Sequence, residues 1–186
     1  MNHVIKIMGI DPGLTNTGYN ISLFNPATGT LEVKLFDTIS AIKVAKKLNK
    51  EEYKTYGNII PLYKYEQILS EIVADHKPEY IVSESAFFCP RTPNAYVSLS
   101  LCINAIERVL YGYSKTLYKI APKAAKQAVS DASASKIAVQ EAILKLPDLK
   151  IKKPKNRQLT SMVEHEADSI AITYTFVKTV LPGVLL

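Results

Sequence analysis

The feature that most constrains the fold is an acidic turn directly after an apolar run near the start of this 186-residue chain. The β-branched run Val4–Ile10 predicts a buried first strand, which Pro12 and Gly13 end by turning the chain. Asp11 then lies at the carboxyl end of a central strand, where clefts open in α/β sheets. A buried carboxylate there needs a partner: divalent metal ions, or nucleotide phosphates held through a metal.

Hydrophobic periodicity predicts one α/β domain. Three strands, Val4–Ile10, Gly18–Phe24 and Thr30–Ile39, are joined by short turns as an antiparallel meander. Helices and strands then alternate. Two further strands are expected over Tyr80–Ser83 and Thr116–Ile120, and helices are expected over Ile59–His76, Asn94–Tyr113, Pro122–Ser130 and from Ser133 or Ser135 to Leu146. A basic loop over Ile151–Arg157 precedes a last helix that begins near Ser161, where Ser161 and Glu164 have the spacing of a capping box. We therefore expect a five-stranded mixed sheet with helices on both faces.

The positive charge is unevenly distributed. The chain has a net charge of +6, but Lys115–Arg157 alone carries +8. Such a basic half indicates either a surface that holds a polyanion or a solubilising lysine-rich face. A further lysine-rich stretch, Ala41–Gly57, is predicted to be an insertion or an arm.

The cysteines and the chain ends favour the cytoplasm. Cys89 and Cys102 lack metal-ligand spacing and are expected to be reduced thiols. A strand that follows Met1 almost at once leaves no room for a signal peptide. The apolar stretch Ser169–Leu186 is too short and too broken for a transmembrane helix, so no membrane partner is expected.

Four side chains from three elements are candidate metal ligands. Glu84 ends the Tyr80–Ser83 strand, and His165 and Asp168 share one face of the last helix by their i, i+3 spacing. With Asp11 they offer the oxygen and imidazole ligands that suit Mg²⁺ or Mn²⁺. Two ions about 4 Å apart would activate water and stabilise the leaving oxygen of a phosphodiester.

Each of these residues also has an ordinary structural explanation. Acids are common in a first helical turn because they interact favourably with the helix dipole. Glu164 is explained as the partner of Ser161 in the capping box. His165 alone is more often structural than a ligand, and Glu84 alone can cap a turn. The four together indicate a site more strongly than any one of them.

With these four residues in this order, the chain resembles the RuvC family of Holliday junction resolvases. The resemblance lies in Asp11-Pro12-Gly13, Thr17-Gly18-Tyr19, Glu84 and His165-Glu166-Ala167-Asp168, and it extends to Lys77–Tyr80, Asn94-Ala95, Ala124–Val129 and Ala134–Lys136. It implies an RNase H-like fold, a homodimer, and Mg²⁺-dependent nicking of four-way DNA junctions for recombination and repair.

The resemblance also assigns site residues. It implies that Asp11, Glu84 and Asp168 are catalytic carboxylates that hold two Mg²⁺ ions, with Mn²⁺ as a substitute. It also implies that His165 is a ligand at a position where many members have Asp, so that the site has one negative charge fewer. Lys126 and Lys136 match basic residues near the DNA backbone. Phe87 matches an aromatic wedge at the junction centre, a role that Phe88 could take instead. Alternatively, Phe87 is a core residue, and Lys126 and Lys136 lie on solvent-exposed faces of their helices.

Three other functions stay open. The Asp11–Thr17 turn also resembles the first phosphate loop of actin, Hsp70 and sugar kinases, but those proteins need two lobes, and the basic half is unexpected for them, so no nucleotide cofactor is expected. An RNase H-like module that binds branched DNA without cutting would need a broken metal site. A nuclease of the same fold acting on other branched DNA or on RNA–DNA hybrids would share the same ligands.

Overall fold

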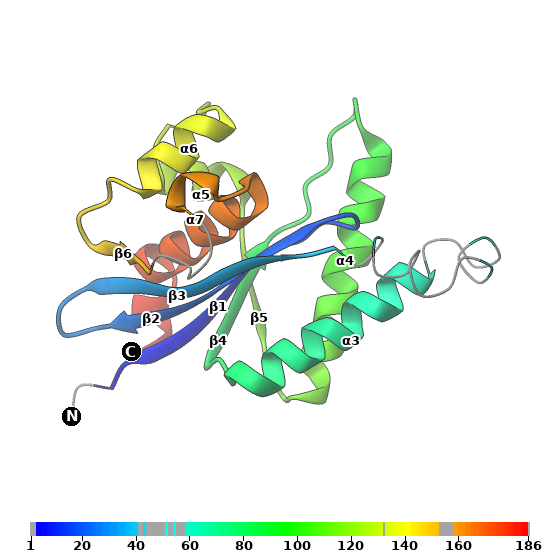
Figure 1. Cartoon of the computed structure of the whole chain (residues 1–186), viewed down its shortest axis with the longest axis horizontal. Coiled ribbons are helices and arrows are strands. Elements are labelled where there is room, and N and C mark those ends of the chain that lie inside the picture. The colour runs from blue at the N-terminus through cyan, green and yellow to red at the C-terminus, as the bar shows by residue number, and fades with distance from the viewer. Residues whose placement is uncertain are drawn as a thin grey trace.

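The computed structural model describes residues 3–40, 43, 51, 54, 59–131, 133–152 and 158–185. In this part of the chain, six strands form one sheet in the order β5-β4-β1-β2-β3-β6 (Figure 1). The strands are β1 (Ile5–Asp11), β2 (Thr17–Asn25), β3 (Thr30–Ile39), β4 (Tyr80–Glu84), β5 (Leu117–Ile120) and β6 (Leu149–Ile151). The helices are α3 (Ile59–His76), α4 (Pro93–Gly112), α5 (Pro122–Val129), α6 (Lys136–Ile143), the 3₁₀ turn η1 (Leu159–Ser161), α7 (Glu164–Thr179) and α8 (Leu181–Val184).

The predicted meander is confirmed. Strands β1, β2 and β3 pair antiparallel, and the Asn25–Gly29 turn joins the last two. The side chain of Asn25 accepts a hydrogen bond from the backbone N–H of Ala27 at 3.0 Å, and Gly29 adopts a φ of +66° that other residues rarely adopt. Turn chemistry and strand alternation therefore agree, and β3 has the bounds that the sequence predicts.

The positions of Asp11 and Glu84 depend on which strands are neighbours. Strand β4 pairs parallel with β1, with Ile10 opposite Ser83. Because parallel strands end at the same edge of a sheet, the residues that follow this pair, Asp11 and Glu84, lie side by side at the carboxyl edge.

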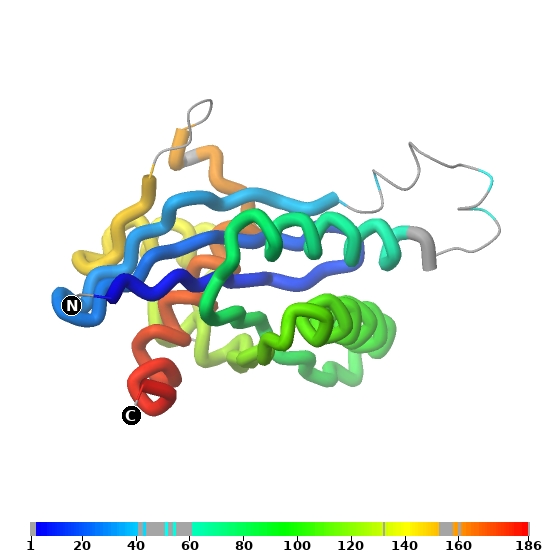
Figure 2. The backbone as a smooth tube through the Cα atoms, turned by 90° about the horizontal axis from the view of Figure 1, so that it is seen from below, coloured from blue at the N-terminus to red at the C-terminus, as the bar shows by residue number. Residues whose placement is uncertain are grey.

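Two apolar layers hold the helices to the sheet. On one face α7 packs on the sheet against β1 and β2, with Phe176 and Ile170 fully buried, and α5 and α6 pack against α7 (Figure 1). On the other face α3 lies across the meander strands, with Leu69 packed among residues such as Ile10 and Ile21, and α4 packs beside it (Figure 2). Helices on both faces, as predicted, leave the carboxyl edge of the sheet as the place for a site.

The prediction of five strands is wrong by one. Leu149–Ile151 pairs parallel with Leu31–Val33 and adds β6 beyond β3, where the sequence indicated the approach to a basic loop. Leu149 is buried and Lys150 is exposed. A three-residue strand is too short for this alternation to stand out in a sequence.

Helix α6 is also shorter than predicted, and Ser135 rather than Ser133 is its cap. The Ser135 hydroxyl accepts a hydrogen bond from the N–H of Ala138 at 3.3 Å. Most of Ala41–Gly57 and residues 153–157 of the basic loop lie outside the described residues, so the insertion and the single-domain organisation stay predictions. Among the described helices, none combines the length and apolar character needed to cross a bilayer.

Candidate active site

One groove at the carboxyl edge of the sheet gathers most of the predicted site residues. It is lined by seven of the eight: Asp11, Glu84, Phe87, Lys126, Lys136, His165 and Asp168. The eighth, Phe88, is 62% exposed, and its ring packs edge-on against Tyr96 with 5.8 Å between ring centroids. Residues separated by more than 150 positions in the sequence are thus brought to one surface.

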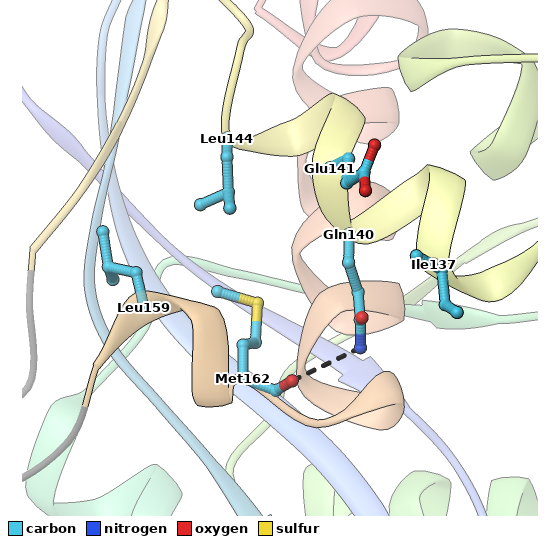
Figure 3. Close-up of a pocket in the computed structure, with 6 residues that line it drawn as sticks. All are labelled: Ile137, Gln140, Glu141, Leu144, Leu159 and Met162. Atoms are coloured by element: carbon cyan, nitrogen blue, oxygen red, sulfur yellow. Dashed lines mark hydrogen bonds between the residues drawn. The ribbon is translucent and has the colours of Figure 1, made fainter.

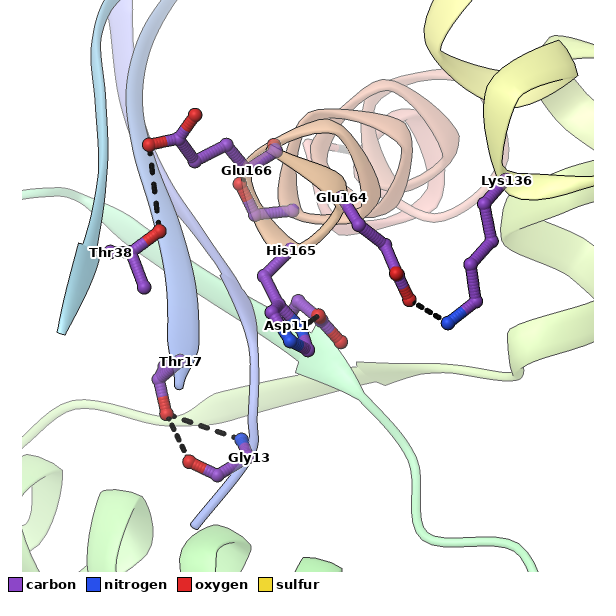
Figure 4. A network of polar contacts seen from close by, with 9 residues as sticks. Asp11, Gly13, Thr17, Thr38, Lys136, Glu164, His165 and Glu166 are labelled. Atoms are coloured by element: carbon purple, nitrogen blue, oxygen red, sulfur yellow. Dashed lines mark hydrogen bonds and ion pairs between the residues drawn. The ribbon is translucent and has the colours of Figure 1, made fainter. Parts of the chain in front are cut away.

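Three elements supply the four candidate ligands. Strands β1 and β4 end in Asp11 and Glu84, while the first turns of α7 supply His165 and Asp168. The closest contact joins His165 Nδ1 to Asp11 Oδ2 at 2.6 Å (Figure 4). This hydrogen bond connects the start of α7 directly to the end of the central strand.

A buried acid anchors the first turn of α7. Glu166 is 1% exposed; its Oε2 accepts from the backbone N–H of Val163 at 2.9 Å, and its Oε1 accepts from the Thr38 hydroxyl on β3 at 3.4 Å (Figure 4). The predicted Ser161–Glu164 capping box is therefore wrong: α7 begins at Glu164, and Ser161 lies in η1. With Glu166 directed at the sheet, His165 is left to face the groove.

Thr17 and Gly18, at the start of β2, determine the positions of two neighbouring backbone segments. The Thr17 hydroxyl donates to the carbonyl oxygen of Gly13 at 2.9 Å and accepts from its N–H at 3.1 Å, which closes the loop after Asp11. A Cβ on Gly18 would lie 1.9 Å from the carbonyl oxygen of His165. Strand β2 can approach α7 this closely only because Gly18 has no side chain.

Electrostatics in the groove favour protonated carboxylates. Burial, with the negative charges of Asp11 and Asp168, raises the pKa of Glu84 to about 7. Burial, with Asp11 and Glu164 nearby, raises the pKa of Asp168 to about 6. Burial is the main cause of both shifts, and the neighbouring carboxylates add to it.

The environment raises the pKa values of both Asp11 and His165. Burial raises the pKa of Asp11 above its ordinary value, although the hydrogen bond to His165 acts in the opposite direction. That same hydrogen bond raises the pKa of His165. Each shift favours the protonated form of its own side chain.

The donor set has the chemistry of a divalent metal site without a finished geometry. Among the described residues, no three acidic, imidazole or thiol side chains converge closely enough to hold an ion. The donors are nevertheless those that Mg²⁺ and Mn²⁺ prefer, and a cation would stabilise the ionised forms of Glu84 and Asp168, which burial and mutual repulsion disfavour. A cation at Asp11 and His165 would compete with protonation of these side chains, because metal ligands bind in their deprotonated forms.

Two lysines bring positive charge to the groove in different ways. Lys126 on α5 lies near enough to Glu84 and Asp168 to lower their pKa values slightly against the opposing effect of burial. Lys136, at the start of α6, forms an ion pair with Glu164, at the start of α7 (Figure 4). Sequence reasoning missed this role of Glu164, which it explained as a capping residue.

A second, more apolar hollow lies between α6 and η1. It is lined by Ile137, Gln140, Glu141, Leu144, Leu159 and Met162, and the Gln140 amide donates to the carbonyl oxygen of Met162 at 3.3 Å (Figure 3). None of the predicted ligands lines it, so the polar chemistry of this face is concentrated in the groove at Asp11.

Comparison with known proteins identifies the family. The family model described as crossover junction endodeoxyribonuclease RuvC matches residues 7–176. A curated relative, the crossover junction endodeoxyribonuclease RuvC of Treponema denticola, is 29% identical over 171 residues, which cover 91% of this chain and 83% of that protein.

Solved structures share the fold. Thermus thermophilus RuvC in complex with a Holliday junction substrate matches with a TM-score of 0.69 at 18% identity, over 96% of this chain and 97% of that chain. The yeast mitochondrial Holliday junction resolvase matches with a TM-score of 0.64 at 13% identity, over 94% and 78% of the two chains. The fowlpox virus Holliday junction resolvase matches with a TM-score of 0.60 at 15% identity, over 95% and 100%. With its RNase H-like sheet and a family match over nearly its whole length, this chain belongs to the RuvC family of crossover junction endodeoxyribonucleases.

Proposed function

We propose that this protein resolves four-way DNA junctions by symmetric paired nicks, using divalent metal ions to hydrolyse the phosphodiester. The observation that carries the proposal is the groove at the carboxyl edge of the sheet, where Asp11, Glu84, His165 and Asp168 line the same surface as two lysines. Membership of a family of crossover junction endodeoxyribonucleases supports this choice over a non-cleaving module.

Each group in the groove has a distinct task in this proposal. Asp11, Glu84, His165 and Asp168 would hold two Mg²⁺ ions, with Mn²⁺ as a substitute. When bound, such ions lower the pKa of a water nucleophile and stabilise the leaving oxygen. Lys126 and Lys136 place positive charge beside the scissile phosphate and offset the negative charge that develops there.

The substrate and the assembly follow from symmetry. A two-fold homodimer would present two grooves to opposite strands of a two-fold junction, because protein symmetry mirrors DNA symmetry. Phe87 and Phe88, which are 53% and 62% exposed, are available to stack on unpaired bases at the branch point. Solved complexes of Thermus thermophilus RuvC and of the fowlpox virus resolvase with Holliday junctions support DNA of this form as the ligand. A cytoplasmic location, with Cys89 and Cys102 reduced, completes the proposal.

Cleavage of a strand-labelled mobile four-way junction in Mg²⁺, beside a linear duplex and an RNA–DNA hybrid, tests the proposal. We expect paired nicks in the junction alone. Asp11→Asn should abolish cleavage and leave junction binding largely intact, whereas Asp75→Asn, on an exposed position of α3, should cut normally. Junction binding should weaken steeply as salt increases, because phosphate contacts release counterions.

Other results would redirect the assignment. Tight binding without nicks in both Mg²⁺ and Mn²⁺ would indicate a binding module. Hybrid cutting without junction cutting would retain the metal site and replace the substrate. Wild-type cleavage by Asp11→Asn would refute the mechanism.

A further inference from the structure

We propose that Glu164 holds Lys136 in the DNA-free protein and competes with the substrate phosphate for it, so that this acid sets how tightly the groove binds DNA. The inference rests on the proposed function, since it concerns the same groove. It assigns Glu164 a role in substrate affinity rather than in helix capping or metal binding.

The two side chains meet across the mouth of the groove. Lys136 is the first residue of α6, directly after its Ser135 cap, and Glu164 is the first residue of α7. Their ion pair therefore bridges the starts of two helices, and both residues line the groove that contains Asp11 and Asp168 (Figure 4). A phosphate that enters the groove arrives at the position where Lys136 is already bound.

The pair is exposed enough to exchange partners. The Lys136 side chain is 66% exposed and that of Glu164 is 34% exposed. Exposed ion pairs contribute little to stability, and the Lys136 ammonium can rotate from a carboxylate to a phosphate without crossing a packed core. Glu164 therefore restrains Lys136 reversibly.

The charge balance of the groove makes this competition consequential. Burial is the main cause of the raised pKa values of Asp11 and Asp168, and the negative charge of Glu164 acts on both in the same direction. Of the two lysines in the groove, Lys126 has no ion-pair partner in the part of the chain that the structure describes, whereas Lys136 is neutralised. In the wild type, the gain from a Lys136–phosphate contact is thus offset by loss of the Glu164 pair and by repulsion between Glu164 and the phosphate.

A double-mutant comparison measures the competition directly. Dissociation constants for a four-way junction are measured in EDTA at fixed salt for the wild type, Glu164→Gln, Lys136→Met and the double variant. We expect Glu164→Gln to tighten binding about threefold to fivefold, the range that an exposed ion pair allows. Lys136→Met should weaken binding slightly when Glu164 is present. In the Glu164→Gln background, the loss of affinity caused by Lys136→Met should be about threefold to fivefold larger.

The ion pair between Glu141, on α6, and Lys145, just beyond the end of α6, supplies a matched control. Its atoms lie 3.9 Å apart, both side chains are exposed, and neither residue lines the groove. Glu141→Gln removes the same charge and should change junction affinity by less than about twofold, since this exposed charge lies outside the groove lining and is screened by salt.

Three results would overturn the inference. In the first, Lys136→Met costs the same affinity with and without the Glu164 charge. In the second, Glu141→Gln tightens binding as much as Glu164→Gln does. In the third, Glu164→Gln abolishes Mg²⁺-dependent cleavage without tightening binding, which would make Glu164 a metal ligand. Equal wild-type affinity for the junction and for a duplex of the same length would instead refute the proposed substrate. The Lys136 comparison would then still decide the inference on the duplex.

Discussion

Replacing Gly18 by Ala tests how strictly the position of α7 controls cleavage. The new Cβ would lie 1.9 Å from the carbonyl oxygen of His165 and 2.8 Å from the backbone nitrogen of Glu166. Ordinary Cβ contacts begin at 3.4 Å, so the first turn of α7 must retreat by more than 1 Å. No side-chain rotation relieves the clash, because both atoms belong to the backbone.

The expected losses follow from this displacement. Overpacking of a well-packed contact costs about 1–3 kcal/mol of folding stability. A shift of about 1 Å in a reacting group costs about a hundredfold in rate, and here His165 and Asp168 would move away from Asp11 and Glu84. We therefore expect a cleavage rate about a hundredfold lower, with junction affinity within about threefold of the wild type.

Single-turnover cleavage, junction binding and thermal unfolding of three alanine variants distinguish local displacement from general destabilisation. Gly9→Ala places a Cβ 1.8 Å from Thr173 Oγ1 and 2.7 Å from the carbonyl oxygen of Ser169, both further along α7 than His165, and should lower stability with a smaller loss of rate. Gly112→Ala meets no atom within 4 Å and should leave both properties near wild type. Cleavage by Gly18→Ala within about threefold of wild type, or an equal loss of rate in Gly9→Ala at matched stability, would refute the reasoning.

Two further predictions concern titration and thiol reactivity. The folded pKa of Glu84, about 7, exceeds its ordinary value of 4.5, so the unfolded chain loses this proton first, and the metal-free protein should become less stable as pH rises from about 4.5 to 7. Glu84→Gln should flatten that decline in melting temperature, and identical pH dependence in both proteins would contradict it. A hydrogen bond with Thr92 lowers the pKa of Cys89, whereas burial raises that of Cys102 to about 12. One thiol per chain should therefore react rapidly with an aromatic disulfide reagent and disappear in Cys89→Ser; two rapidly reacting thiols would contradict the burial of Cys102.

The elements with long, regular periodicity were predictable from the sequence. Strand Thr30–Ile39 and helix Ile59–His76 have the predicted bounds, because alternation over ten residues and apolar spacing over eighteen leave little ambiguity. The Asp11–Glu84 juxtaposition was predictable only on the condition that their strands are neighbours, which the parallel β1–β4 pairing satisfies.

Features that depend on distant contacts were not predictable in this way. Strand β6 forms because Leu149–Ile151 meets the edge of β3, a partner more than a hundred residues earlier in the chain. Glu166 rather than Glu164 caps α7 because the helix begins at Glu164, which makes Glu166 the residue three positions after the N-cap Val163; its other oxygen reaches Thr38 on β3, a contact that no local pattern reveals. The Glu164–Lys136 pair likewise arises from where two helices begin in space, not from their sequence spacing.

The hydrogen bond between Asp11 and His165 has a consequence for protein synthesis. Its two residues are 154 positions apart, and α7, which carries His165, packs against the first two strands. A ribosome releases Asp11 early, but the groove cannot assemble until the chain has emerged well beyond Asp168 and α7 has docked. Nascent chains that end before Asp168 should therefore lack nuclease activity, because the order of synthesis delays assembly of the groove until α7 is made.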